Sequence, residues 1–239
     1  MIETTIQWRA AGPYQSVNAS KAGLVAETRL ALLTYQRLGD LDATKRELLQ
    51  DALPQRSRSS REGVVERIVS RLVRWQPPEW VCQDLVVAAT SEDGVDLRAL
   101  LLLHASRQDR LLYDVLQCLV APRWLQGELQ IIRADVQGFL DEGETDHPEV
   151  ARWSRQTQQK LASNILAILH DYGLLTGKVT RHIVEPVVRS NVAEHLERLL
   201  LEEGVAPAVV PVHPDWQLWL WDEQRVTGWR LRRDRERSA

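Results

Sequence analysis

The sequence predicts a mainly α-helical fold of compact multi-helix domains, with helix-turn-helix or winged-helix character and a short C-terminal β-hairpin. Three observations lead to this prediction. Apolar residues recur at three- and four-residue spacing through most of the 239 residues, as on one face of a helix. Glycine and proline repeatedly interrupt that pattern, which indicates several short helices. Near the end of the chain the apolar residues alternate instead, which is typical of strands.

The first part of the chain divides into an arm and a helical domain. Residues 1–19, with Gly12-Pro13, are predicted to be the arm, and residues 20–140 the N-terminal helical domain. Helices are predicted at 20–38, from Asp40 to Pro54, and at about 60–75, 79–90, 96–106 and 108–121. Gly39 ends the first helix, and Ser59 with Glu62 has the spacing of a capping box before the third.

The acidic segment DEGETDHPE at 141–149 is the predicted linker to a second module, residues 150–230. That module opens with SRQTQQKLASNILAILHDYGLLTG, an amphipathic helix starting near His147-Pro148 and ending at Gly173. A short strand is predicted in KVTRHIVEPVV and a helix at 191–203. A Trp-rich hairpin is then predicted, with WQLWLW and VTGWRLRR as its strands and DEQR as its turn. The Arg-rich tail at 231–239 is predicted either to bind nucleic acid or to fray.

Composition excludes some classes of protein. The net charge of -3 and the pI of about 6.1 exclude a globally basic nucleic-acid binder, so a binding surface would have to be a local patch. Cys82 and Cys118 lie in apolar helical stretches. This predicts two buried free thiols in a reducing compartment. The N-terminus lacks the pattern of a signal peptide, and no apolar stretch has the length of a membrane span. We therefore expect a cytoplasmic protein with no membrane partner.

Motifs for catalysis are missing from the sequence. There is no GxGxxG, GxxxxGK[ST], HExxH or GxSxG, and the six histidines never fall at metal-ligand spacing. We therefore expect a protein that is not an enzyme and has no catalytic residues, no cofactor and no metal site.

A run of arginines is the first candidate for nucleic-acid binding. Between Pro54 and Trp75 six arginines outnumber two glutamates. They are Arg56, Arg58, Arg61, Arg67, Arg71 and Arg74. The last three share one helix face, and guanidinium groups suit phosphate oxygens. Six phosphate contacts would give a slope of log affinity against log salt of about -5. The alternative is a solvated face that pairs with acidic neighbours.

The helix at the start of the second module is the second candidate. Its outer face is polar and carries no carboxylate, and a glycine turn, two cations and a short strand follow it. These candidate residues are Gln156, Gln159, Lys160, Ser163, Lys178 and Arg181. The pattern resembles the recognition helix and wing of a winged-helix module, since Gln suits base edges and Lys suits phosphates. The alternative is a face that packs against another helix.

The predicted C-terminal hairpin is the third candidate, as a partner-binding site. Strand alternation would place apolar or aromatic side chains on both faces of WQLWLW. The candidate anchors are Trp219, Trp221 and Trp229, which would dock either on their own domain or on a partner.

Three stretches, in this order and spacing, point to a family. They are KAGLVAETRLALLTYQRLGDLDATKRELLQDALPQRSRSSREGVVERIVSRL, ADVQGFLDEG and TQQKLASNILAILHDYGLL. Over roughly residues 20–200 the chain resembles the BrxA family, small accessory proteins of bacterial BREX phage-defence systems. The resemblance implies a mainly helical, NusB-like, non-enzymatic protein that binds nucleic acid. It also implies other BREX proteins as partners, such as the methyltransferase, the ATPase or the phosphatase-like component.

Three hypotheses follow from the sequence. In the first, the protein is a DNA-binding accessory subunit that contacts double-stranded DNA through the arginine run and the 156–170 helix face. In the second, it is an adaptor whose Trp-rich hairpin and helix faces dock other defence proteins. In the third, it binds RNA, as the likeness to NusB suggests.

Overall fold

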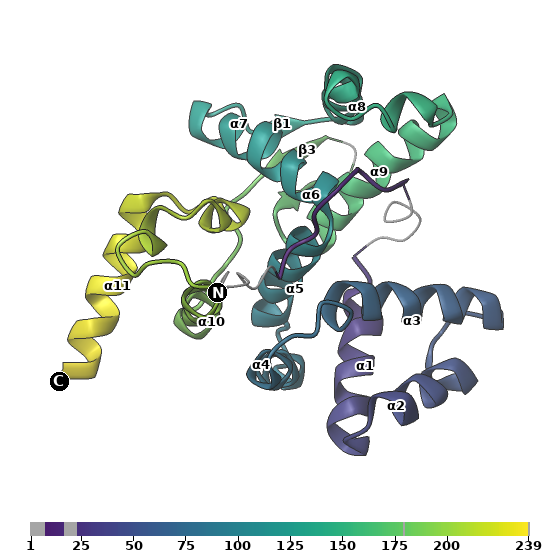
Figure 1. The fold of residues 1–239 in the computed structure, drawn as a ribbon, viewed down its shortest axis with the longest axis horizontal. Coiled ribbons are helices and arrows are strands. Elements are labelled where there is room, and N and C mark those ends of the chain that lie inside the picture. Colours follow the sequence, from purple (N-terminus) through teal and green to yellow (C-terminus); the bar gives the residue numbers. More distant parts are fainter. Residues whose placement is uncertain (1–7, 17–22, 179, 239) are drawn as a thin grey trace, which may run out of the picture.

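The computed structural model describes residues 8–16, 23–178 and 180–238, and within them the chain is mainly α-helical, as predicted (Figure 1). The predicted arm lies partly outside these ranges, as do residues 20–22 of the first predicted helix and residue 239 of the tail. The helices of the first half are α1 Val25–Leu38, α2 Leu41–Glu47 with the π-helical turn η2 Leu48–Ala52, α3 Arg58–Leu72, α4 Glu79–Thr90 and α5 Val95–Gln108.

The second half continues with helices and a few short strands. The helices are α6 Arg110–Val115, the π-helical η3 Leu116–Val120, α7 Ala121–Gln126, α8 Arg133–Glu142, α9 Arg155–Asp171, α10 Ser190–Glu202 and α11 Glu223–Ser238. Short 3-10 turns are η4 Gly143–Thr145, η5 Val150–Arg152, η6 Val210–Val212 and η7 Pro214–Trp219. The strands are β1 Gln130–Ile131, β2 Leu175–Thr176 and β3 Arg181–Ile183.

Local sequence signals fix several helix ends. Gly39 ends α1 at a φ of 66°, and its N–H donates to the Tyr35 carbonyl at 2.8 Å. The Asp40 carboxylate accepts the Ala43 N–H at 2.6 Å and so caps α2. The predicted cap at Ser59 is wrong, because Ser57 caps α3 by accepting the Ser60 N–H at 3.1 Å.

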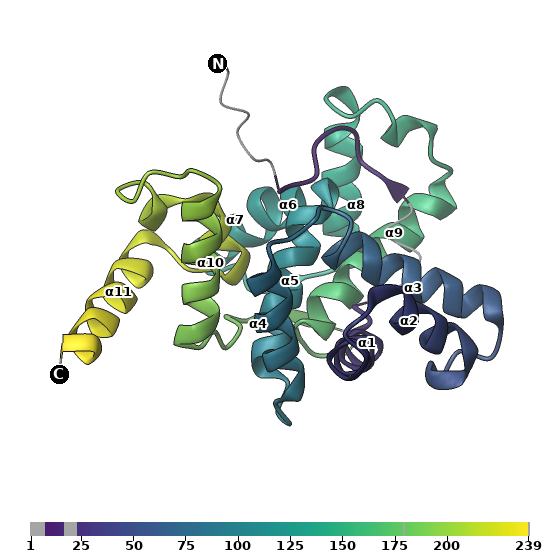
Figure 2. The same ribbon diagram turned by 60° about the horizontal axis from the view of Figure 1, so that its bottom comes forward.

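Helix α5 lies in the centre of the protein. It packs against α1, α3, α4, α6, α10 and η7, and most of its side chains are buried. Figure 2 shows α1 to α3 at one end of the molecule and α10 with α11 at the other. The buried apolar residues form one cluster that runs from Tyr14 to Trp229. The predicted linker, residues 141–149, holds the end of α8 and the turn η4, beside the packed pair α8 and α9.

The predicted C-terminal hairpin is wrong. The first four residues of WQLWLW belong to the 3-10 turn η7, Leu220 and Trp221 follow it, and VTGWRLRR lies inside α11. A strand would place Trp216 and Trp219 on opposite faces of the chain, whereas the turn buries both of them, at 1% and 0% exposure. The indole of Trp216 stacks on that of Trp221, with centroids 5.8 Å apart. Burial of aromatic surface therefore overrides the alternating pattern.

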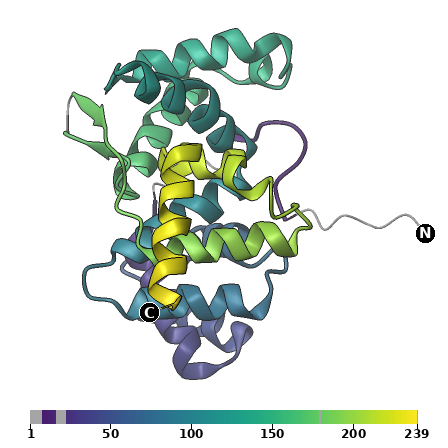
Figure 3. The same cartoon turned by 90° about the vertical axis from the view of Figure 1, so that its left-hand side faces the viewer.

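The Arg-rich tail does not fray, because residues 231–238 continue α11. Acidic side chains of α10 pair with its arginines. Arg233 pairs with Glu197, and Arg237 lies 3.1 Å from Glu194. Opposite charges thus hold α11 across α10 (Figure 3).

Candidate nucleic-acid interface

The arginine run does not form one exposed surface. Arg67 and Arg71 are each only 7% exposed in α3. Arg71 donates to the Gly23 carbonyl at 3.0 Å and to the Tyr172 hydroxyl at 3.1 Å. It therefore links α3 to the end of α9 and is not free to contact a phosphate backbone. This corrects the prediction that the two arginines belong to a solvent-facing stripe.

Two other arginines of the run are exposed but pair with acidic side chains of α3. Arg58 lies 3.0 Å from Glu62, one turn further along α3. Arg74 pairs with Glu66. These pairs match the alternative reading of the run, in which the arginines balance nearby carboxylates.

The remaining two arginines lie at the start of α3. Arg61 donates to the backbone carbonyls of Leu49 and Gln55, at 2.9 and 3.1 Å, and so ties the loop before α3 to η2. Arg56 is exposed. The six side chains therefore do not gather into one patch. Sequence spacing gave no signal of the contacts of Arg61 and Arg71, because those partners lie outside α3.

Helix α9 presents the polar face that the sequence predicts. Gln156, Gln159 and Lys160 are exposed, and Ser163 is half-buried with its hydroxyl donating to the Gln159 carbonyl at 3.0 Å. The helix has no acidic residue until Asp171, its last position. Its surface therefore offers amide and ammonium groups without a carboxylate between them.

The opposite face of α9 fixes the helix in place. Leu161, Ile165 and Leu169 are almost completely buried. Ser154 caps the N-terminus by accepting the Thr157 N–H at 3.2 Å. The helix therefore begins at Arg155, after the predicted start near residue 147, because η5 occupies the intervening residues.

A β-hairpin follows α9 directly. Strands β2 and β3 are antiparallel, with Leu175 opposite Ile183, which confirms the strand predicted after Gly177. Gly177 has a φ of +86°, and a Cβ atom there would lie 2.2 Å from the Thr180 carbonyl oxygen. Only glycine fits this turn without a shift of the backbone. Figure 3 shows the hairpin projecting from the helical body.

The hairpin carries the other two predicted cations. Lys178 is exposed in the turn, next to residue 179, which lies outside the described ranges. Arg181 is half-buried in β3 and pairs across the sheet with Ile131 of β1. The polar face of α9 and the turn of the hairpin thus come from consecutive segments.

The order of elements around this face is α7, β1, α8, α9, β2 and β3. The strands form one sheet in the order β1-β3-β2, in which both pairs are antiparallel. Helix α8 packs closely on α9. The sheet closes one end of this helix pair and leaves the outer face of α9 uncovered.

The predicted partner anchors lie inside the protein. Trp219 is fully buried and its indole N–H donates to the Ala99 carbonyl at 3.0 Å. Trp221 and Trp229 are 4% and 5% exposed. Of the two readings that the sequence left open, the structure thus has the tryptophans docked on their own core.

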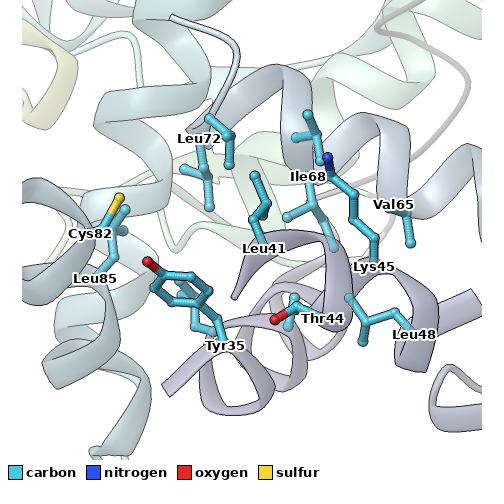
Figure 4. Close-up of a pocket in the computed structure, with 14 residues that line it drawn as sticks. Tyr35, Leu41, Thr44, Lys45, Leu48, Val65, Ile68, Leu72, Cys82 and Leu85 are labelled. Carbon is cyan, nitrogen blue, oxygen red and sulfur yellow. The ribbon is translucent and has the colours of Figure 1, made fainter. Parts of the chain in front are cut away.

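A mostly apolar cavity of about 130 Å³ lies between α1, α2, α3 and α4 (Figure 4). Leu41, Ile68 and Leu85 are among the side chains that line it. Lys45 also lines it, and its ammonium lies 3.2 Å from the Asp42 carboxylate. A wall of this kind suits a hydrocarbon group and not a phosphate.

Nowhere in residues 8–16, 23–178 and 180–238 do three or more His, Cys, Asp or Glu side chains group as metal ligands. In the same ranges no helix has both the length and the apolar character needed to cross a bilayer.

The chain is similar in sequence and in fold to known proteins. The sequence model of the BrxA family matches residues 12–199, which includes α9 and the hairpin but not α11. A Bacillus cereus protein named "BREX protein BrxA" is 20% identical over 189 residues, covering 78% of this chain and 91% of that protein. The crystal structure of an uncharacterized protein from Magnetospirillum magneticum has a similar fold, with a TM-score of 0.62 and 18% identity. It covers 80% of this chain and 96% of the other.

Proposed function

The chain belongs to the BrxA family, and we propose that it is a non-enzymatic, double-stranded DNA-binding component of a BREX phage-defence system. The Bacillus cereus relative is named as a BREX protein, which supports the assignment to such a system. In this proposal the outer face of α9 and the β2–β3 hairpin contact the duplex. The arginine run of α3, from Arg56 to Arg74, is left out of the interface.

The order of helices and strands is the observation that carries the proposal. From α7 onward the chain order is helix, strand, helix, helix and two strands, and the sheet order is β1-β3-β2. This order matches the arrangement of a winged helix. In that arrangement α9 takes the place of the recognition helix, and the turn at Gly177 takes the place of the wing. A recognition helix lies in the major groove, where base edges are accessible.

The side chains on α9 suit this role. The amides of Gln156 and Gln159 are exposed, and glutamine forms paired hydrogen bonds with adenine in the major groove. Lys160 on the same face and Lys178 on the wing are exposed cations for phosphate oxygens. Because the face carries no carboxylate before Asp171, a duplex would meet no like charge there.

A fluorescence-polarisation titration with labelled duplex at several salt concentrations tests the proposal. Three phosphate contacts, from Lys160, Lys178 and Arg181, would give a slope of log affinity against log salt of about -3. The six-arginine surface predicted from sequence would give about -5. Absence of binding at low salt would contradict the proposal.

The same assay separates the other two hypotheses. Stronger competition by single-stranded RNA than by unlabelled duplex would favour an RNA-binding role. A protein that binds neither nucleic acid but co-purifies with the methyltransferase of the same system would favour the adaptor.

A further inference from the structure

Residues 8–14 form a strap that lies on the helical body without helix or strand structure. The Ala10 N–H donates to the Arg107 carbonyl at 2.7 Å, and the Gln108 side chain donates to the Trp8 carbonyl at 2.8 Å. Both partners lie at the end of α5. In Figure 1 this segment, coloured purple, then crosses α6 and reaches toward α9. The strap therefore runs from the central helix to the segment that precedes α9.

The first end of the strap is held by buried partners. The Trp8 ring packs edge-on against Trp75, with ring centroids 5.8 Å apart. Arg9 donates to the carboxylates of Asp215 and Glu203, at 3.1 and 3.2 Å, and both acids are buried. Buried charges require close counter-charges, so these ion pairs fix the strap at this end.

Tyr14 forms the other end of the strap and is 6% exposed. Its ring stacks on the imidazole of His147, with centroids 3.6 Å apart. Its backbone N–H donates to the Glu149 carboxylate at 2.5 Å, and its hydroxyl donates to the Asp114 carboxylate at 2.9 Å. Because Asp114 belongs to α6, one tyrosine links that helix to the segment between α8 and α9.

The contacts continue from Glu149 into α9. Glu149 is followed directly by η5, whose first residue, Val150, is fully buried. The Gln158 side chain, in the first turn of α9, donates to the Val150 carbonyl at 3.3 Å. Energetic coupling between two parts of a protein can be carried by a contiguous series of such contacts. Here the series runs from Asp114 through Tyr14 and η5 to α9.

Different segments hold the two ends of α9. Asp171, its last residue, accepts the Gly23 N–H at 2.8 Å, which fixes the C-terminal end. Gln156 and Lys160, which are proposed above to contact DNA, lie near the N-terminal end. The series of contacts from Tyr14 reaches this N-terminal end.

We propose that Tyr14 is a positioning residue for α9, which fixes the N-terminal half of that helix for duplex binding without touching DNA itself. The effect on DNA rests on the proposed function. Loss of the Tyr14 contacts would keep every DNA-contacting side chain but let the start of α9 move. Apparent affinity falls with the fraction of molecules in the binding-competent conformation, so release of the strap weakens duplex binding.

Hydrogen–deuterium exchange of the full chain without DNA tests the positioning of α9. Tyr14→Phe keeps the ring stack and loses one hydrogen bond, and should speed amide exchange in residues 150–160 about fivefold. Tyr14→Ala also loses the stack and should speed it about thirtyfold. Exchange in α4, which serves as the internal reference, should stay unchanged in both variants.

Tyr113→Phe is the matched control. The Tyr113 hydroxyl also donates to a carboxylate at 2.9 Å, but that carboxylate is Asp215 of the C-terminal segment. Tyr113 lies on α6, one residue from the acid that Tyr14 contacts. Loss of its hydroxyl should therefore leave exchange in residues 150–160 at the wild-type rate.

Fluorescence polarisation then measures the effect on duplex binding. Tyr14→Ala should weaken binding severalfold at every salt concentration and keep the slope of log affinity against log salt, because no phosphate contact is lost. Tyr14→Phe should lie between Tyr14→Ala and the wild type, since it keeps the stack. Lys160→Gln should instead make the slope shallower.

The two measurements separate this proposal from the proposed function. Wild-type exchange in residues 150–160 of Tyr14→Ala, or a rise that extends to α4, would overturn the role of Tyr14. The same holds for an equal response in Tyr113→Phe, or for a shallower salt slope in Tyr14→Ala. Faster exchange confined to residues 150–160, in a protein that binds no duplex, would support the positioning of α9 and refute the duplex interface.

Discussion

The imidazole rings of His104 on α5 and His195 on α10 face each other in the protein interior, with their Nε2 atoms 2.9 Å apart. The Nδ1 atom of His195 lies 2.7 Å from the Asp84 carboxylate on α4. Because a carboxylate accepts, His195 donates from Nδ1 and accepts at Nε2 from the N–H of His104. The three side chains link three helices through neutral imidazoles.

Acid should therefore destabilise the protein through this pair. Burial, with the neighbouring His195 and Arg107, lowers the pKa of His104 well below its usual value. Burial also lowers the pKa of His195, although Asp84 opposes the shift, and Arg107 and Arg198 add to it. Both rings bind protons more readily in the unfolded chain, so stability falls as pH drops through about 6.5, the pKa of an unfolded histidine.

Urea unfolding between pH 7.5 and 5 measures this effect. Each ring contributes up to about 1.4 kcal/mol per pH unit below its unfolded pKa. The variant His104→Leu should show a shallower dependence of the unfolding free energy on pH, because one titrating ring is gone. An unchanged slope in that variant would contradict the assignment to this pair.

A buried ion cluster should help to hold the C-terminal segment in position. Arg107 is 1% exposed at its side chain, pairs with Glu203 and donates to the Asp215 carboxylate at 2.7 Å. Arg107→Met would leave both carboxylates short of a counter-charge in the interior. We expect a loss of about 3–5 kcal/mol in the free energy of unfolding, measured with urea. Arg58→Gln breaks an exposed pair and should cost less than about 1 kcal/mol.

Replacement of Lys160 tests the proposed contact between α9 and DNA. Lys160→Gln should weaken binding to all duplex sequences alike and reduce the steepness of the salt dependence by about 1, since one phosphate contact is lost. Gln159→Ala should instead change the preference between sequences, because an amide reads base edges. Fluorescence polarisation with several duplexes measures both effects. If Arg58→Gln weakened binding as much as Lys160→Gln, the interface would lie on α3.

Gly177 should be needed for the shape of the β2–β3 hairpin. Gly177→Ala places a methyl group against the Thr180 carbonyl and requires a left-handed backbone conformation. We expect duplex affinity to fall as the turn rearranges. Gly39→Ala has the same backbone requirement, at a φ of +66°, but meets no atom within 4 Å. That control should lose about 1 kcal/mol of stability and keep its duplex affinity.

Trp219 should act through stability and not as a surface anchor. It is fully buried and its indole donates to α5. Trp219→Ala should therefore cost about 3–5 kcal/mol in the free energy of unfolding. Thermal unfolding and co-purification with defence proteins, measured on the same variant, test this. A variant that keeps its Tm but loses a partner would restore the docking interpretation.

Local signals in the sequence predicted much of the secondary structure. Gly39 and Asp40 fix the boundary between α1 and α2 through backbone conformation and a side-chain cap, both of which act within a few residues. Helix periodicity likewise placed α4 at residues 79–90. The exposed face of α9 was predicted because its other side carries a clear apolar stripe.

The predictions that were wrong concern residues whose partners are distant in sequence. The alternation in WQLWLW was read as a strand because the pattern contains no information on which surfaces would cover the tryptophans. Arg71 looked solvent-exposed because nothing near it in sequence identifies Tyr172, 101 residues away, as its partner. Local sequence patterns likewise did not predict the order of strands in the sheet.

By itself the amino-acid sequence determined the helical class, most helix boundaries and the uncharged-to-basic face of α9, because caps, glycine turns and periodicity act over one or two helical turns. Tertiary structure alone decided which cations remain exposed. Burial of apolar surface packs α3 against α5 and takes Arg67 and Arg71 into the interior. Their positions are set by packing between distant segments, which depends on how the whole chain folds.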